Sequence, residues 1–443
     1  MPISRLSFHV GLTVCILMHG CWDFGMDKTG DIAVIDVIQQ FGKYQEIPVS
    51  EFVTELEYIP LETCDDCLIG QVNRGFIVTS THIFVAGGAP FLYAFDRDGR
   101  FIGKIGSVGQ GPGEYRFLRA LSIDENKQSL YVDALYYLLE YSWDGIFRRS
   151  FKIPSTTIEI NNRIENWSMD KVFFVRDNLF VGHTLNFSGN EKYNFHLIND
   201  FGQVVKSFDN HILLDRRPRA TDAEFSMRPF RISERMYLKE YANDTLYCLN
   251  EQNELVPQFV FDLGKYTFSK KKRENDVEMR YYLDGVIIIP DELTPMVGTP
   301  NYIFFSIHVR DASTINIPYP QRPQPRQTIR IPNVRYVDIR TPLGIYDMVN
   351  QKTRLLDTHP VTRRQGLINN LDGGLSFWPK YYNYSDNELI DLWQAHTMKE
   401  LLTDDYFNAH EIKAPQAHQK LKELLGKLDE DDNPVVVIGK LKK

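Results

Sequence analysis

The sequence predicts an all-β fold, a six-bladed β-propeller with a helical segment inserted in blade 5 and C-terminal helices packed on it. The main observation is a β-hairpin pattern, two apolar runs joined by a turn rich in Asp, Asn and Gly, that returns five times. The copies lie at 92–105, 138–151, 195–208, 246–259 and 343–356. One small sheet cannot bury both of its faces alone, so a repeated hairpin indicates neighbouring sheets that cover one another. The high aromatic share of 13% also suits the faces of β-sheets.

Composition and charge narrow the class of protein. Of the 443 residues, 43% are hydrophobic and 24% are charged, which is typical of a globular protein and excludes general disorder. The formal net charge is −8, and without residues 1–20, which carry Arg5 and no acid, it is −9. Nucleic-acid binding needs clustered Lys and Arg, so the sequence predicts no nucleic-acid partner. The one basic run, 270–273, is followed at once by acidic residues, as on a solvated helix face.

The N-terminus predicts export. Residues 1–20 combine Arg5 with an apolar core at Val10–Met18, which is the pattern of a signal peptide. This core is too short to span a bilayer as a helix. The signal ends in Gly20-Cys21, and this end resembles a bacterial lipoprotein box, in which the cysteine is lipidated and becomes the new N-terminus.

Lipidation of Cys21 would hold the folded body at a membrane. We therefore expect a tether over residues 21–44, a propeller over 45–443, and a location in the cell envelope, on the periplasmic side or at the cell surface. The alternative is that Cys21 is an ordinary cysteine just past a signal-peptidase cut.

The remaining cysteines favour structure over chemistry. Cys64 and Cys67 form a Cys-Asp-Asp-Cys tetrapeptide, and Cys248 stands alone in an expected strand. A redox CxxC usually opens a helix, whereas strand-like residues flank this one. A zinc site would need two more ligands, and no second CxxC or paired His follows nearby. We expect a structural disulfide or two unpaired thiols, with redox or metal chemistry as the alternative.

Six blades can be placed around the repeats. The first four are expected at 70–106, 118–153, 172–208 and 230–263. Blade 5 is interrupted by a helical insert at about 264–296 and resumes at Tyr302–Val309. Blade 6 begins near Gln365, and the early strand Val53–Leu61 is expected to complete it, since an open ring would leave exposed strand edges.

The C-terminal part changes character. Residues 385–402 have apolar side chains at helical spacing, with Ser385 and Glu388 in a capping-box pattern. We expect helices over about 385–427, broken by Pro415, and a final strand from VVVIGKL that returns to the sheet.

One stretch carries a family resemblance. The segment GKIGSVGQGPGEY at Gly103–Tyr115 resembles the NHL-type repeat and, more closely, a family of bacterial six-bladed β-propeller lipoproteins of largely unassigned function. Weaker family-like elements are NNLDGGLSFWP at Asn369–Pro379 and the closing NPVVVIGKLK. The resemblance implies a propeller over nearly the whole chain beyond residue 45, and it implies no catalytic residues. The glycines could also suggest a phosphate cradle, but a strand follows Pro112 and Gly113 where a P-loop or dinucleotide site needs a helix.

No catalytic signature is found in the sequence. There is no HExxH, no His pair at i,i+4 with a carboxylate, and no GxSxG. We place His82, His183 and His308 on inner strands, where they could converge in the channel as ligands or bases; packing within blades is the alternative. The aromatic residues Trp378, Tyr381, Tyr382 and Tyr384 could stack on sugar rings or could pack in the core.

Two functions follow from this sequence. The first is an envelope-tethered propeller that binds a glycan, peptide or protein partner, without catalysis and without a cofactor, because a rigid scaffold with variable loops suits binding. The alternative is a propeller lyase or hydrolase that uses channel-facing His and carboxylates, with or without a divalent metal. Fold alone cannot decide between them.

Overall fold

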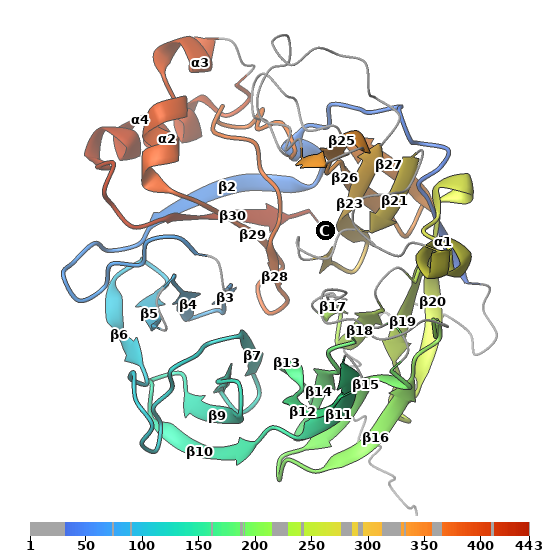
Figure 1. The fold of residues 1–443 in the computed structure, drawn as a ribbon. Helices are drawn as coiled ribbons and strands as arrows, with labels where there is room; N and C mark the ends of the chain where they lie inside the picture. Colours follow the sequence, from blue (N-terminus) through green and yellow to red (C-terminus); the bar gives the residue numbers. More distant parts are fainter. Residues whose placement is uncertain are drawn as a thin grey trace, which may run out of the picture. The chain divides into compact units, whose positions relative to one another are not determined.

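Six antiparallel sheets follow one another around a common axis (Figure 1). The computed structural model describes residues 32–442 except 73–74, 89–90, 161–162, 187–188, 190, 215–228, 241–242, 276–285, 291–295, 312–328, 332–333, 357–365 and 409–411. Each of the six blades contains four strands, numbered here from the axis outward. This arrangement confirms the six-bladed propeller.

The first four blades follow the repeat expected from the sequence. Blade 1 contains β3 (Phe76–Val78), β4 (His82–Ala86), β5 (Leu92–Asp96) and β6 (Phe101–Ile105). Blade 2 contains β7 (Ala120–Asp124), β8 (Ser129–Asp133), β9 (Tyr137–Ser142) and β10 (Phe147–Lys152). Blade 3 contains β13 (Asp170–Arg176), β14 (Leu179–His183), β15 (Tyr193–Asn199) and β16 (Val204–Asp209). Blade 4 contains β17 (Phe230–Ile232), β18 (Arg235–Lys239), β19 (Thr245–Leu249) and β20 (Leu255–Asp262).

Blade 5 is built around one long strand. β23 (Tyr302–Asp311) pairs through its first half with β22 (Val297–Gly298) and β26 (Leu343–Asp347), and β27 (Lys352–Leu356) completes the blade. The second half of β23 pairs with β21 (Val286–Pro290) and β25 (Val334–Arg340), and β25 pairs with β24 (Ile329–Ile331). The blade therefore extends beyond the ring as a second small sheet.

The insert expected at 264–296 is helical only in part. It begins with the short 3-10 helix η2 (Gly264–Tyr266) and helix α1 (Lys270–Asn275), but it also contains strand β21. The apolar run VIIIP of β21 is β-branched, and it pairs with the extended half of β23.

Blade 6 closes the ring with both ends of the folded chain. Its strands are β28 (Tyr381–Asn383), β29 (Glu388–Trp393), β30 (Val435–Leu441) and, outermost, β2 (Val53–Pro60). β2 and β30 are antiparallel, with Tyr58 opposite Val437. The expected closure by the early strand is thus observed; the short helix η1 (Val49–Glu51) precedes β2.

Two segments near the chain ends differ from the expectation. Glu388–Trp393 forms strand β29, not the start of a helix, because β29 lies between β28 and β30 with both faces covered, and its apolar pattern lacks a strand's alternation. The later part of the expected tether at 21–44 is folded, since β1 (Ala33–Asp36) pairs in parallel with β20 at the outer edge of blade 4; residues 21–31 lie outside the described residues.

The C-terminal helices cover the outer part of blade 6. They are α2 (Ala395–Leu401), α3 (Asp404–Asn408) and α4 (Pro415–Lys427). Pro415 stands in the first turn of α4, where its missing N–H is not needed, so it starts a helix and does not break one. Met398, Leu402 and Leu421 join Val435 of β30 in one buried cluster. None of the helices in the described part of the chain is long and apolar enough to cross a bilayer.

The core consists of apolar layers between blades. Six buried clusters each combine side chains from two neighbouring blades, so that every blade is covered on both faces. Between blades 2 and 3, for example, the rings of Tyr131 and Phe174 stack at 5.3 Å, and Phe180 packs edge-on against Tyr131 at 4.9 Å. These contacts supply the cover that a single hairpin sheet lacks.

The glycine-rich stretch before blade 2 is a connection between blades. The Glu114 carboxylate accepts the Gly111 N–H at 2.8 Å, and Tyr115 donates its hydroxyl to Ile105 O at 2.7 Å. Gly113 has φ +74°, and its carbonyl accepts the Tyr141 hydroxyl of blade 2. Glycine is required here because a side chain would be strained at this φ and would meet Phe147 at 2.9 Å.

A buried ion cluster joins blade 6 to blade 1. Arg97, in the turn after β5, donates to both carboxylate oxygens of Glu388 at 3.1 Å, and Lys440 also contacts this carboxylate. The Glu388 side chain is 1% exposed, and Asn383 donates a further hydrogen bond to it. The closing blade is therefore tied to its neighbour by charge as well as by apolar contact.

We predict that Glu388→Gln lowers the free energy of unfolding by about 2 kcal/mol, because the buried side chain loses its charge-assisted hydrogen bonds to Arg97 and Lys440. Urea denaturation measures this change. Asp98→Asn is the matched control in the same turn, since its carboxylate is 74% exposed and pairs with the exposed Arg100. Equal losses in the two variants would contradict a special role for the buried pair.

Candidate functional site

The two faces of the ring differ in their connections. On one face, here the turn face, the first strand of each blade turns into the second, and in blades 1 to 5 the third turns into the fourth. These turns range from two residues (177–178) to five (250–254). The opposite face, here the long-loop face, carries the connections at 153–169, 210–229, 263–296, 312–342 and 394–434.

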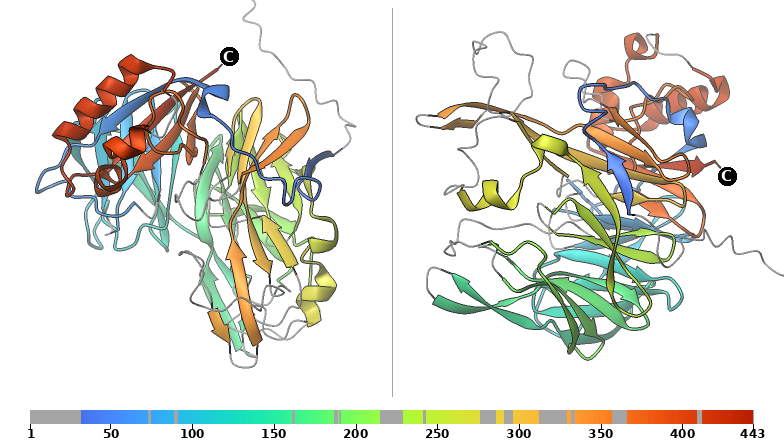
Figure 2. Two further views of the ribbon diagram at one scale, coloured as in Figure 1. Left: turned by 90° about the horizontal axis from the view of Figure 1, so that it is seen from above. Right: turned by 90° about the vertical axis from the view of Figure 1, so that its right-hand side faces the viewer.

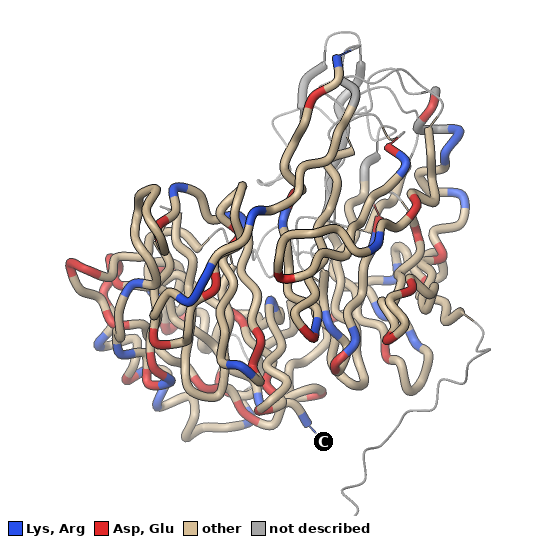
Figure 3. The backbone as a smooth tube through the Cα atoms, turned by 90° about the horizontal axis from the view of Figure 1, so that it is seen from below, with Lys and Arg blue, Asp and Glu red and all other residues tan. Residues whose placement is uncertain are grey.

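Two elements project from the long-loop face. One is the hairpin of β11 (Ser155–Ile160) and β12 (Arg163–Ser168) between blades 2 and 3, and the other is the extended part of blade 5. Figure 2 shows both on the same side of the ring. In Figure 3 they rise on the side opposite the chain's C-terminus, and acidic and basic residues are interspersed along the described chain.

The three predicted histidines lie on second strands, not on the inner strands. His82 is in β4 of blade 1, His183 is in β14 of blade 3, and His308 is in β23 of blade 5. His82 begins its strand at the turn face, whereas His183 ends its strand at the long-loop face. The structure therefore spreads them over three blades. Among the described residues, no group of three or more His, Cys, Asp or Glu side chains is arranged to hold a metal ion.

His82 and His183 both pack against aromatic side chains. His82 stacks on Phe84 at 5.5 Å and hydrogen-bonds to Thr81 Oγ1 at 2.8 Å, and burial lowers its pKa. His183 is 6% exposed and packs against Phe195. Burial, with the charge of Lys171, lowers the pKa of His183 to about 3, so its ring is neutral at physiological pH.

A serine and a histidine meet in blade 3. His196 contacts Ser207 Oγ through Nδ1 at 2.9 Å and Thr184 Oγ1 through Nε2 at 2.7 Å. A nucleophile–base pair needs a third group that orients the base and stabilises its charge. Here the other ring nitrogen of His196 meets the neutral hydroxyl of Thr184. Burial lowers the pKa of His196 to about 4. The arrangement is a hydrogen-bonded core histidine and a weak base.

A bidentate ion pair within blade 2 also contacts the start of blade 3 at the long-loop face. Arg119 donates from Nε and Nη2 to the two carboxylate oxygens of Asp133 at 2.9 and 3.0 Å, and its Nη2 also donates to Met169 O at 2.8 Å. The Asp133 side chain is fully buried, and its Oδ2 accepts the Val172 N–H of blade 3. Asp170 lies 3.5 Å from Arg119 Nη1.

This ion pair supports an unusual turn between β8 and β9. Leu135 has φ +78°, and the Tyr136 N–H bonds to Ala134 O at 3.1 Å, which defines a γ-turn centred on Leu135. The Leu135 N–H donates to Asp133 Oδ1, and Leu135 O accepts from Arg119 and from Ser168. A non-glycine residue at such a φ costs about 1 kcal/mol or more, and the side chains of Asp133, Arg119 and Ser168 hold it there.

A second polar cluster joins blades 3 and 4 on the same face. The Glu240 carboxylate, 2% exposed, accepts from Asn194 at 3.0 Å and from Asn243 at 2.6 Å. His211 Nδ1 lies 3.1 Å from both Glu240 oxygens, and its ring stacks on Tyr247 at 4.5 Å. Burial alone would raise the pKa of Glu240, but the hydrogen bonds of His211 and Asn243 lower it. The hydrogen bond to Glu240 in turn raises the pKa of His211.

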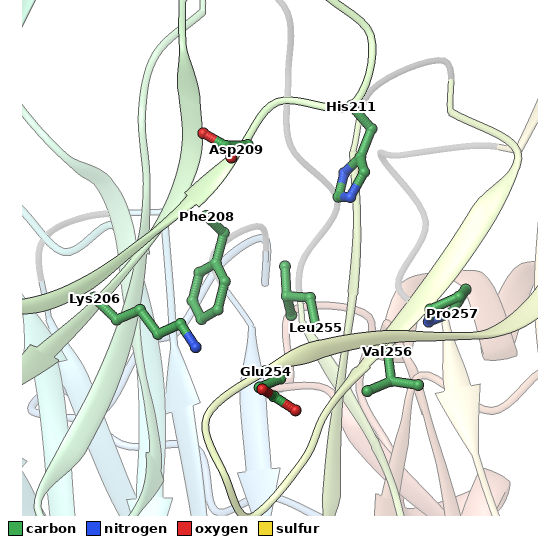
Figure 4. Close-up of a pocket in the computed structure, with 8 residues that line it drawn as sticks. All are labelled: Lys206, Phe208, Asp209, His211, Glu254, Leu255, Val256 and Pro257. Carbon is green, nitrogen blue, oxygen red and sulfur yellow. The ribbon is translucent and has the colours of Figure 1, made fainter. Parts of the chain in front are cut away.

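A shallow pocket opens beside this cluster, between the outer strands of blades 3 and 4 (Figure 4). Its volume is about 390 Å³. Phe208, Leu255, Val256 and Pro257 supply apolar surface, and Lys206, Asp209, His211 and Glu254 supply charge or hydrogen-bonding groups. Both signs of charge are present, so the pocket favours no single class of ion.

Side chains from alternate blades meet near the axis at the turn face. Ser385 of blade 6 donates a hydrogen bond to Glu125 of blade 2, past the intervening blade 1. Burial lowers the pKa of the Arg231 guanidinium in blade 4, and the charges of Tyr384, Tyr381 and Glu125 act in the opposite direction. These groups bring side chains of blades 2, 4 and 6 together near the axis at the turn face.

The aromatic residues considered from the sequence divide into two groups. Trp378 and Tyr382 are 5% and 6% exposed and pack in the core between blades 5 and 6. Tyr381 and Tyr384 are partly exposed near the axis, beside Arg231. Cys64 and Cys67 form a disulfide, and Cys248 is a buried free thiol.

Sequence reasoning missed the Arg119–Asp133 pair, the γ-turn at Leu135 and the Glu240 cluster. A charged residue within an apolar inner strand, as in Phe230-Arg231-Ile232, is a sequence signal that could have predicted the polar contacts near the axis. The γ-turn has no such signal, because Leu is a residue that rarely occupies a positive φ.

Comparison with known proteins identifies the family. A family model described as a domain of unknown function, DUF4934, matches residues 32–440. The chain belongs to the DUF4934 family. No curated protein matches the sequence.

Solved structures resemble this DUF4934 chain in fold. A Bacteroides fragilis protein described as exported is 16% identical with a TM-score of 0.59, over 93% of this chain and all of that one. A DUF4221 family member from Bacteroides vulgatus is 9% identical with a TM-score of 0.46, over 88% and 97%. Virginiamycin B lyase from Staphylococcus aureus is 12% identical with a TM-score of 0.32, over 68% and 88%. The first similarity supports the fold, and the TM-scores of the other two are too low to support an argument.

We predict that the stabilising effect of His211 depends on pH. Because its pKa is raised in the folded protein, its contribution is fully present below the unfolded pKa of about 6.5 and is lost as the pH rises through the folded value. The difference in melting temperature between the wild type and His211→Gln should therefore shrink between pH 6 and pH 9. Gln at the exposed His396 is the control, and a difference that stays constant with pH would contradict the prediction.

Proposed function

We propose that the protein is an exported, lipid-anchored binding module whose partner, a glycan, peptide or protein, contacts the long-loop face. The observation that carries the proposal is the difference between the two faces. Every blade turns tightly on one of them, and the long connections and both projecting elements lie on the other. Binding residues concentrate on loops that a rigid scaffold positions.

The scaffold beneath these loops is well suited to that role. Apolar layers join all six neighbouring pairs of blades, and the Arg119–Asp133 and Glu240–His211 clusters fix the base of the long-loop face. A site whose supporting groups are already ordered loses less entropy on binding. The contact between Ser385 and Glu125 joins blades 6 and 2 at the opposite face.

Export and anchoring rest on the N-terminal sequence. The signal-like residues 1–20 end in Gly20-Cys21, and the folded unit starts at Ala33. The similar Bacteroides fragilis protein, which is described as exported, agrees with this location. A lipid on Cys21 would retain the module at a membrane.

We predict that a photo-crosslinking amino acid forms partner adducts in native envelopes only from the long-loop face. Ile164 on β12 and Leu213 after β16 represent that face, and both are exposed. Ile146 and Phe201, in turns of blades 2 and 3, are the controls on the turn face. Adducts that form only from Ile146 or Phe201 would contradict the proposal.

We predict that Cys21→Ala abolishes incorporation of labelled palmitate and moves the protein from the membrane to the soluble envelope fraction. The thiol is the only attachment point that a lipoprotein box offers. Cys64→Ala, which changes a cysteine of the folded unit, should leave the label in place. Persistent labelling of the Cys21→Ala protein would exclude this anchor.

A further inference from the structure

The outer edge of blade 4 carries an additional strand that belongs to no hairpin. β1 pairs in parallel with the last four residues of β20, and Ile35 lies opposite Phe261. Ile35 is 0% exposed and belongs to the same buried cluster as Phe261 and as Leu355 of β27 in blade 5. The added strand therefore fills the space between the outer strands of two neighbouring blades.

Blade 3 has the same kind of strand end without an added strand. β16 ends in Ser207-Phe208-Asp209, just as β20 ends in Val260-Phe261-Asp262, and each is the fourth strand of its blade. In the part of the chain that the structure describes, β16 pairs with β15 alone. The backbone N–H and C=O groups on the free edge of such a strand can pair with another strand.

The pocket in Figure 4 lies where an added strand would place a side chain. Phe208 faces blade 4, since it belongs to the same buried cluster as Leu249 of β19. Residues paired on adjacent strands lie on the same face of a sheet, so a residue opposite Phe208 would also point toward blade 4. There it would meet the pocket of about 390 Å³ that Phe208 and residues 254–257 of β20 line. Leu255, Val256 and Pro257 give this pocket the apolar surface that an aliphatic side chain needs.

β16 is also the least protected of the outer strands. Its neighbouring side chains Val204 and Val205 are 44% and 51% exposed. Within the described residues, none of the other five outer strands exposes two neighbouring large apolar side chains. β1 covers part of β20, and the Gln45 N–H donates to Leu355 O on β27 at 2.9 Å. An exposed apolar edge of this kind is a site for pairing with another chain.

We propose that an acceptor groove, formed by residues 206–209 of β16 and 254–257 of β20, binds an extended peptide of a partner protein. The peptide adds a strand to blade 3 and places an aliphatic side chain in the pocket. In such strand addition the backbone hydrogen bonds supply affinity and the side-chain pockets supply specificity. The inference goes beyond the proposed function, because the groove is built from strands and does not depend on a partner at the long-loop face.

An extended peptide fits this groove better than other occupants. The regularly spaced N–H and C=O groups of a strand edge are matched by another backbone in extended conformation. The protein itself fills the neighbouring edge in this way with residues 33–36. The acceptor groove also offers both signs of charge, from Lys206, Asp209 and Glu254, so an ionic ligand of one sign would meet repulsion there.

The test is fluorescence anisotropy of the purified protein with a labelled peptide that carries the sequence of residues 33–37, AVIDV, between two lysines at each end. This peptide is expected to bind. The same peptide with Asp in place of the central Ile should bind at least about tenfold more weakly, because the buried aliphatic side chain is lost. Hydrogen exchange should show slower exchange of the amides of residues 206–209 on binding, since their free edge becomes paired.

A pair of variants locates the site. Val256→Lys places a charge in the pocket and should weaken binding of the AVIDV peptide by about tenfold or more. Val349→Lys is the matched control, since Val349 is 55% exposed in the turn between β26 and β27 of blade 5. It should bind the peptide as the wild type does, and the melting temperatures of both variants show whether each is folded.

Three results would overturn the inference. The first is no binding at about 1 mM peptide, which corresponds to a negligible affinity. Another is binding that leaves exchange at residues 206–209 unchanged or that instead releases β1 from residues 259–262 of β20. The third is a dimer of the free protein in which the amides of residues 206–209 are already protected, because a second copy would then occupy the edge.

Discussion

The structure depends on burial of apolar surface between neighbouring blades. A four-stranded hairpin sheet has two apolar faces, and each face needs a partner of the same kind. Six sheets satisfy this need only if the last one meets the first, and the buried cluster that joins Ile390 and Ile438 of blade 6 to Ile83 and Phe95 of blade 1 shows that it does. The pairing of β2 with β30 makes this possible, because it gives the final blade its fourth strand. The two faces follow from this closure, since the connections can leave each blade only at the ends of its strands.

Polar groups are used sparingly and mostly at contacts between blades. Arg97 with Glu388 and Asn194 with Glu240 each join two different blades, and the Arg119–Asp133 pair of blade 2 contacts blade 3 through Met169 O and the Val172 N–H. A buried ion pair gains little net free energy over apolar packing, but it tolerates only one geometry. These pairs therefore set the register between sheets that apolar contact alone would allow to slide. Two of them also lie beneath the long-loop face, so the same contacts that align blades hold the groups available for binding.

The sequence predicted the blades well because the repeated hairpin is a local pattern. The runs around residues 92–105 and 138–151 form β5–β6 and β9–β10 as expected, and the turn between each pair carries the anticipated Gly. The prediction failed where tertiary contacts override local pattern. The prediction of a helix over Glu388–Trp393 is wrong because a strand covered on both faces has no alternation. The sequence predicts His82, His183 and His308 on inner strands, and the structure has each on the second strand from the axis, because sequence does not number strands from the axis. The γ-turn at Leu135 could not be predicted at all, since its conformation is imposed by Arg119 and Ser168, which are distant along the chain.

The closing strand has a consequence for how the chain folds. Val53 lies near the start of the folded unit and pairs with Leu441, near its end. Contacts between such distant residues raise the contact order and slow folding. Until β30 is available, β2 has an open edge, and an unpaired edge of this kind invites pairing with other chains. Strand β30 therefore decides when the ring closes, and loss of this short strand would expose more of the molecule than its length suggests.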